Sequence, residues 1–119
     1  MSIIQAVAHW EKQRIYETQN TVRLKRFYSN ITHWELLLSV YERAGDPEMG
    51  ITDYVESLKS TRVTRLTIYN FIKDRISDGD FVVIPSVKRS KKSLALSDEL
   101  KQELECYMMA NWQFSQSIQ

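Results

Sequence analysis

Cysteine is almost missing from this sequence, because Cys106 is the single one. No intramolecular disulfide can form, which suits the reducing cytosol, and we expect a cytoplasmic protein. Its neighbours Leu104, Tyr107 and Met108 predict that Cys106 is a buried thiol. Redox sensing is the less favoured interpretation, since the chain contains no second cysteine to resolve an oxidised one.

Flexible and membrane-spanning segments are also missing. Three glycines and two prolines leave no linker, and we expect residues 1–119 to form one domain. The apolar N-terminal run is broken by Gln5, His9 and Glu11 and lacks a basic start. We therefore expect neither a signal peptide nor a membrane span, and no membrane partner.

Histidine is scarce, which argues against catalysis. His9 and His33 are the only two, and neither has a cysteine or an acid nearby at metal-ligand spacing. Glu35, close to His33, is explained by helix capping. The sequence has no glycine-rich phosphate loop and no catalytic dyad. We expect no enzyme, no metal and no cofactor.

Charge is distributed unevenly along the chain. The net charge of +1 conceals a segment, Lys59–Lys92, with nine basic and three acidic residues, a net +6. The remainder has seven basic and twelve acidic residues, a net −5. A concentrated basic segment indicates a polyanionic partner, with nucleic acid the leading candidate.

The first segment, residues 2–28, is predicted to be mostly helix. Ile3, Val7, Trp10 and Ile15 approximate one apolar stripe, and no Gly or Pro interrupts the run. The helix either packs back on the core or completes its burial against a second copy, and we favour the second alternative.

The second predicted helix follows a break at Ser29 and Asn30. Thr32 and Glu35 fit a capping box, and Trp34, Leu37, Leu38 and Tyr41 give the buried stripe. Gly45 and Pro47 end the helix.

The central segment predicts two helices joined by a short turn. Met49–Ile51 is expected to be a short strand and Thr52 an N-cap, followed by a helix with Tyr54, Val55 and Leu58 inward. A second helix starts at Val63 or Thr64 and ends at Ser77, burying Ile68, Phe71, Ile72 and Ile76. This is the helix-turn-helix pattern.

The third segment predicts a β-hairpin and a last helix. Residues 81–84 and 93–96 are strand-like, and a basic tip, residues 88–92, lies between them. Ser97 is a good N-cap for a helix over residues 98–113, and the residues after Trp112 are expected to fray.

In this order the elements resemble the MarR-type winged helix-turn-helix transcriptional regulators. The resemblance covers roughly residues 31–105 and is carried by three pieces: ITHWELL at residues 31–37, Thr67–Asn70 through Gly79, and KRSKKSLALS at residues 88–97. The chain departs from the family pattern at Lys88, where the family has Asp, and at Leu100, where it has Gly.

The resemblance implies a mainly α fold with a small β-hairpin (α+β), organised as a winged helix-turn-helix. Residues 1–29 would be an N-terminal dimerisation helix, 31–97 the winged core and 98–113 a C-terminal dimerisation helix. The implied function is sequence-specific binding of double-stranded DNA by a homodimeric transcriptional regulator. A small-molecule effector stays open.

The implied DNA contacts follow from side-chain chemistry. Arg, Asn and Thr recognise base edges, whereas Lys and hydroxyl groups suit phosphates, and a wing-tip Arg suits a minor groove. The expected DNA-binding residues are Arg62, Thr64, Arg65, Thr67, Tyr69, Asn70, Lys73, Lys88, Arg89, Lys91 and Lys92. Arg75 is expected to form at most a surface ion pair of little consequence.

Three alternatives remain at this point. The basic residues can be an ordinary solvated surface. The same fold can serve as a protein–protein module that binds an acidic partner. A third, weaker alternative is a replication or plasmid-maintenance factor that uses the fold on DNA.

Overall fold

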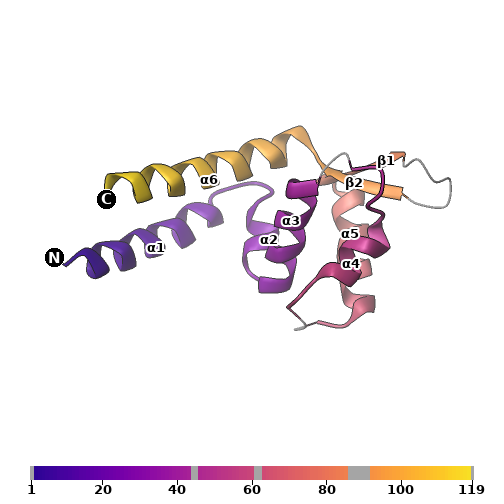
Figure 1. The fold of residues 1–119 in the computed structure, drawn as a ribbon, viewed down its shortest axis with the longest axis horizontal. Helices are drawn as coiled ribbons and strands as arrows, with labels where there is room; N and C mark the ends of the chain where they lie inside the picture. Colours follow the sequence, from indigo (N-terminus) through magenta and orange to yellow (C-terminus); the bar gives the residue numbers. More distant parts are fainter. Residues whose placement is uncertain (1, 44–45, 61–62, 86–91, 119) are drawn as a thin grey trace.

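The computed structural model describes residues 2–43, 46–60, 63–85 and 92–118. The chain is mainly helical, with a two-stranded antiparallel hairpin, and it is elongated, with extents of 56 × 26 × 24 Å. Its radius of gyration is 15.9 Å, against about 13.5 Å for a compact chain of this length. The excess arises because α1 and the far end of α6 run side by side away from the rest, so that both termini lie at one end of the molecule (Figure 1).

We call α1 and the part of α6 beyond Leu104 the arm, and the remainder the head. The head surrounds one hydrophobic core, to which every head element contributes. Phe27 is central to it, with Phe71 at 5.3 Å and Phe81 at 5.4 Å between ring centroids. The fully buried large side chains are Leu24, Phe27, Leu36, Leu37, Val40, Tyr54, Ile72, Phe81, Leu94, Leu100 and Leu104.

The N-terminal helix is shorter than predicted. Helix α1 (Ile3–Gln19) is capped by Ser2, and a separate short helix, α2 (Lys25–Tyr28), follows. The single helix predicted over residues 2–28 is therefore wrong beyond Gln19. The break needs no Gly or Pro: the hydroxyl of Thr21 accepts the N–H of Lys25 at 2.9 Å, and Glu103 accepts the N–H groups of Arg23 and Leu24.

Helix α3 (Ile31–Arg43) begins two residues earlier than the predicted capping box allows. Asn30 caps it, because its Oδ1 accepts the N–H of Thr32 at 2.9 Å and that of His33 at 3.2 Å. The predicted cap at Thr32 is wrong, since Thr32 is fully buried inside the helix. The buried stripe is also displaced: Leu36, Leu37 and Val40 form it, Trp34 and Leu38 are half-buried, and Tyr41 is exposed.

The predicted strand at Met49–Ile51 does not form. Ile51 instead begins helix α4 (Ile51–Ser57), and Gly50 occupies the N-cap position predicted for Thr52. The carboxylate of Asp53 accepts the N–H of Gly50 at 2.8 Å, which secures this start. The inward side chains are as predicted: Tyr54 and Val55 are buried and Leu58 is half-buried.

Helix α5 (Arg65–Ser77) agrees with its prediction. Thr64 is the N-cap, and its hydroxyl accepts the N–H of Thr67 at 3.2 Å. Ile68 and Ile72 are buried, and Phe71 and Ile76 are half-buried against the same core. The chain then reverses at Gly79, whose φ of +83° is a conformation that favours glycine.

Strands β1 (Phe81–Pro85) and β2 (Lys92–Leu96) form the predicted hairpin, with Phe81 opposite Leu96 and Pro85 opposite Lys92. Phe81, Leu94 and Leu96 face the core, while Val82 and Val83 are exposed.

Helix α6 (Asp98–Ser117) starts at the predicted cap, where the hydroxyl of Ser97 accepts the N–H of Leu100. It continues past the predicted end at residue 113, because α1 supports its last turns: Trp10 stacks on Phe114 at 4.3 Å, and its indole N–H donates to Asn111. Among the described residues, none of the helices has both the length and the apolar character needed to cross a membrane.

Candidate nucleic-acid interface

The outward face of α5 carries most of the predicted contacts that the structure describes. Arg65, Thr67, Asn70 and Lys73 are exposed, as is Thr64 at the helix start. The opposite face is locked into the core by Ile68 and Ile72. A helix with one face fixed in this way presents the other at a defined angle, which is what insertion into a groove requires.

Asn70 and Lys73 lie near the middle of this face. Neither side chain forms a hydrogen bond or an ion pair with any other residue that the structure describes. Leu66, 70% exposed, lies one turn before Asn70 on the same line and was not predicted as part of the site. Its place in the first turn, off the predicted stripe of Ile68 and Ile72, is the signal that could have found it, since an apolar side chain there suits a thymine methyl group.

The start of α5 is partly occupied by its own contacts. The hydroxyls of Thr64 and Thr67 lie 2.9 Å apart, and Thr64 also caps the helix. Arg65 pairs with Glu56 of α4 at 3.2 Å, although its side chain is 67% exposed. An exposed ion pair of this kind is worth less than about 1 kcal/mol, so a phosphate or a base can displace it.

Tyr69 takes an intermediate position. It is half-buried and packs against the core, unlike the fully outward residues of α5. Its ring anchors the helix, which adds a structural role to the predicted phosphate contact.

The hairpin places one predicted contact within the described residues. Lys92 is exposed at the start of β2, opposite Pro85. The predicted contacts Arg62, Lys88, Arg89 and Lys91 lie outside the described residues.

Arg75 does not belong to the exposed basic surface. Its side chain is only 13% exposed and binds Asp80 at 2.8 Å and Asp78 at 2.9 Å. The prediction of a weak surface ion pair is wrong for this residue, because its main partner, Asp80, is fully buried. The positive charge of Arg75, which counts toward the +6 of residues 59–92, is therefore neutralised by ion pairs within the protein and is not exposed to a ligand.

Glu35 of α3 positions the segment that leads into α5. Its carboxylate accepts the N–H of Lys59 and that of Ser60, both at 2.8 Å, and the hydroxyl of Ser60 at 2.7 Å. Burial acts to raise the pKa of this carboxyl, but the hydrogen bonds from Lys59 and Ser60 outweigh it and hold the pKa below its usual value. The sequence had assigned this residue to a capping box, and its true role depends on a contact 25 residues away.

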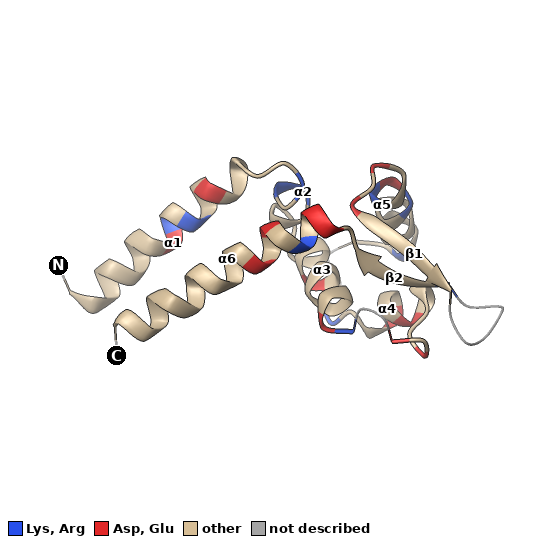
Figure 2. Cartoon of the chain, turned by 90° about the horizontal axis from the view of Figure 1, so that it is seen from above, with Lys and Arg blue, Asp and Glu red and all other residues tan. Residues whose placement is uncertain are grey.

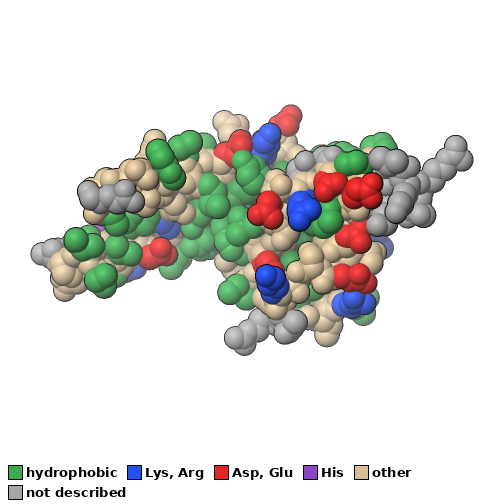
Figure 3. All heavy atoms as spheres, in the orientation of Figure 1, with side chains coloured by type: hydrophobic (Ala, Val, Ile, Leu, Met, Phe, Trp, Pro, Cys, Tyr) green, Lys and Arg blue, Asp and Glu red, His purple; other side chains and the backbone are tan. Residues whose placement is uncertain are grey.

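The arm exposes a large apolar surface. Residues 2–8 and 106–118 contain no Lys, Arg, Asp or Glu, so the far ends of α1 and α6 are uncharged (Figure 2). Hydrophobic side chains gather over these helices in the space-filling view (Figure 3). The exposed large ones on the arm are Ile3, Ile4, Ile15, Tyr16, Met108, Met109, Trp112 and Ile118.

A groove of about 560 Å³ lies between parts of α1 and α6 and is lined by Arg14, Glu103, Cys106 and Tyr107, among others. Cys106 is exposed, so the prediction of a buried thiol is wrong for the single chain. Arg14 is almost fully buried beside this groove, with its guanidinium carbon 4.3 Å from the ring centroid of Tyr107. Such a cation–π contact links the two arm helices.

Comparison of the chain with protein-family models, curated proteins and solved structures gives no match.

Proposed function

We propose that the chain is a winged helix-turn-helix protein that binds double-stranded DNA as a homodimer and regulates transcription. Helix α5 would enter the major groove and the β1–β2 hairpin would lie along the adjacent minor groove. Dimers that place one such helix in each half-site predict a pseudo-palindromic target, with half-site centres about one helical turn apart.

The observation that carries the proposal is the exposed face of α5. Asn70 and Lys73 project from a helix whose other face is buried, and Leu66 continues the same line. Asn can form two hydrogen bonds with adenine, and Lys suits a phosphate or a guanine. The hairpin follows α5 directly in the chain, which is the order of a winged helix.

The arm supports the dimer. Its exposed apolar side chains gather over α1 and α6 (Figure 3), and such a gathering on a protein surface supports an interaction site there. Charged residues are depleted at the centres of protein interfaces, and the ends of both arm helices are free of them. A second copy of the arm meets this surface with the same apolar chemistry.

Duplex binding by matched variants tests the proposal. Lys73→Ala is expected to weaken binding to all duplexes similarly and to reduce the salt slope by about one per protomer. Asn70→Ala is expected to lose about tenfold or more in discrimination at one base pair. Lys101→Ala removes an exposed charge from α6, away from α5, and should leave binding unchanged.

Equal effects of Lys73→Ala and Lys101→Ala would contradict the placement of α5 on DNA. Absence of duplex binding at low salt, with retained binding to an acidic protein, would favour the protein-interaction alternative instead.

A further inference from the structure

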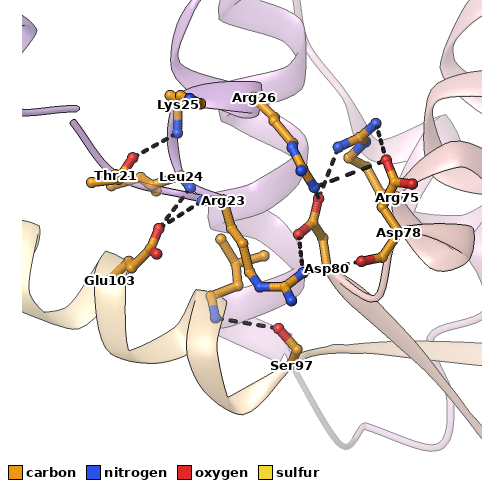
Figure 4. Close-up of polar contacts among 11 residues, drawn as sticks. Thr21, Arg23, Leu24, Lys25, Arg26, Arg75, Asp78, Asp80, Ser97 and Glu103 are labelled. Carbon is orange, nitrogen blue, oxygen red and sulfur yellow. Dashed lines mark hydrogen bonds and ion pairs between the residues drawn. The ribbon is translucent and has the colours of Figure 1, made fainter. Parts of the chain in front are cut away.

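One buried carboxylate lies where the head meets the arm. Asp80 is fully buried, and three arginines from different elements bind it (Figure 4). Arg23 donates to Oδ1 at 2.8 Å, and Arg26 and Arg75 donate to Oδ2 at 2.9 and 2.8 Å. A buried charge persists only when it is paired and hydrogen-bonded, and this carboxylate satisfies both conditions.

The backbone of Asp80 is fixed as well. Its N–H donates to the carbonyl of Arg75 at the end of α5, and its carbonyl accepts the N–H of Ser97 at the start of α6, both at 2.8 Å. Asp80 therefore connects α5, the base of the hairpin and the first turn of α6 through directional hydrogen bonds.

Arg23 completes the connection from the other side. Its backbone N–H donates to Glu103 of α6 at 3.0 Å, and Leu24 donates to the same carboxylate oxygen at 2.9 Å. Its guanidinium reaches both Asp80 and the carbonyl of Asp78. One residue in the corner after α1 thus joins α6 to the α5–β1 turn, and the hydrogen bond to Asp80 raises the pKa of its guanidinium.

Helix α6 runs without a break from the core into the arm, whereas α1 reaches the head through this corner, whose apolar contacts alone do not specify its orientation. Leu24 and Phe27 anchor it in the core, but hydrophobic attraction has no preferred direction. Charge-assisted hydrogen bonds have a strongly preferred direction, and the planar guanidinium of arginine adds geometric specificity. The orientation of α1 relative to the head is therefore expected to depend on the polar contacts of Arg23.

We propose that Arg23, Asp80 and Glu103 form a joint that fixes the orientation of α1, one of the two arm helices, relative to the head. The proposal concerns the single chain and holds without DNA. Its functional consequence rests on the proposed function: in a dimer formed through the arms, a fixed α1 keeps the arm surface rigid and so restricts the separation of the two α5 helices, and hence the half-site spacing that the protein accepts.

Distance measurement between spin labels tests the joint in the protein alone. Labels at Lys12→Cys on α1 and Asp74→Cys on α5, in a Cys106→Ser chain, report the distance between α1 and the head. Both positions are exposed, so the labels do not disturb the core. Dilution with excess unlabelled chain isolates the distance within one protomer. We expect one narrow distribution, and at least a twofold broader one in Arg23→Met, which keeps the apolar stem but loses the fork.

Arg43→Met is the matched control, because it removes only a surface pair with Asp46 at 3.7 Å. Its distribution should equal that of the parent chain. An unchanged width in Arg23→Met would overturn the joint. Asp80→Asn should broaden the distribution in the same way, and if that variant fails to fold, Arg23→Met decides the question alone.

Duplexes that differ in half-site spacing test the functional consequence. The parent protein should prefer one spacing by tenfold or more over a site lengthened by half a helical turn, about five base pairs. Arg23→Met should reduce this ratio towards one without changing affinity for a single half-site. A retained ratio would contradict the consequence, whereas failure of the parent to bind any duplex would refute the proposed function and leave the label experiment decisive for the joint.

Discussion

Replacing Glu35 by glutamine should destabilise the protein although the shape of the side chain barely changes. The carboxylate accepts hydrogen bonds from two backbone N–H groups and one hydroxyl, at 2.7 to 2.8 Å. A glutamine offers one acceptor oxygen and turns its NH2 donor towards another donor. At least one backbone N–H of residues 59 and 60 would then lose its partner in the protein.

The magnitude follows from these contacts. A hydrogen bond to a charged group contributes about 1.5–3 kcal/mol when it is buried, and water at this half-buried site replaces part of that. We expect Glu35→Gln to lower the free energy of unfolding by about 2 kcal/mol, which corresponds to a fall in Tm of about 8 °C for a domain of this size.

Chemical and thermal unfolding of the two proteins measure this difference. Glu42→Gln is the control, because Glu42 is exposed on the same helix. The pKa of Glu35 is lowered in the folded state, so its contribution is present above the unfolded pKa of about 4.5 and is lost as pH falls through the folded pKa. The gap between parent and variant should therefore shrink in acid. A loss below about 0.5 kcal/mol at pH 7, or a gap independent of pH, would refute the role of Glu35.

Two further predictions concern pH and assembly. His33 stacks on Phe71 at 3.6 Å, and its burial, with the charge of Arg75, lowers the pKa of its imidazole below 6.5. The unfolded chain then binds the proton more readily, so the free energy of unfolding should fall as pH drops below 6.5. His33→Phe should remove the part of the acid-induced fall in Tm that His33 causes. Equal falls in Tm in both proteins would contradict this role of His33. Trp112→Glu, on the exposed face of the arm, should convert a dimer into a monomer in light scattering while Tm at low protein concentration stays within a few degrees. A parent chain that stays monomeric at micromolar concentration would contradict the dimer itself.

The sequence predicted those elements whose signals are local. Helix α5 has its cap at Thr64 and its buried stripe within one continuous stretch, and Ser97 marks the start of α6 in the same way. The hairpin follows from two short β-prone runs around a basic tip. Each of these depends on residues a few positions apart, so spacing alone was sufficient.

Some errors were local, as at the start of α4, where Gly50 and Asp53 form the cap that was predicted at Thr52. Others occurred where a distant residue helps to decide the structure. Thr32 and Glu35 have the spacing of a capping box, but Asn30 caps α3 and Glu35 binds residues 59 and 60. Likewise the break after α1 depends on Glu103, 80 residues later. No helical periodicity contains such information, because it concerns only neighbours on one helix.

The candidate site divides in the same way. The exposed residues of α5 followed from its amphipathic pattern, since the face opposite a buried stripe is exposed. Arg75 belongs to the same helix, yet its guanidinium forms an ion pair with Asp80. The amphipathic pattern of α5 could not show this pair. Leu66 is exposed on that face although it is apolar, and the predicted contacts there were all polar or charged.

Duplex affinity as a function of salt concentration is the most direct test of DNA binding. About six phosphate contacts per protomer predict a slope of log affinity against log salt of about −5 for each protomer and about −10 for a dimer on two half-sites. A steep slope of this size, reduced by about one per protomer in Lys73→Ala, is the result that the proposed interface predicts. A slope near zero, or no duplex binding at low salt, would contradict it.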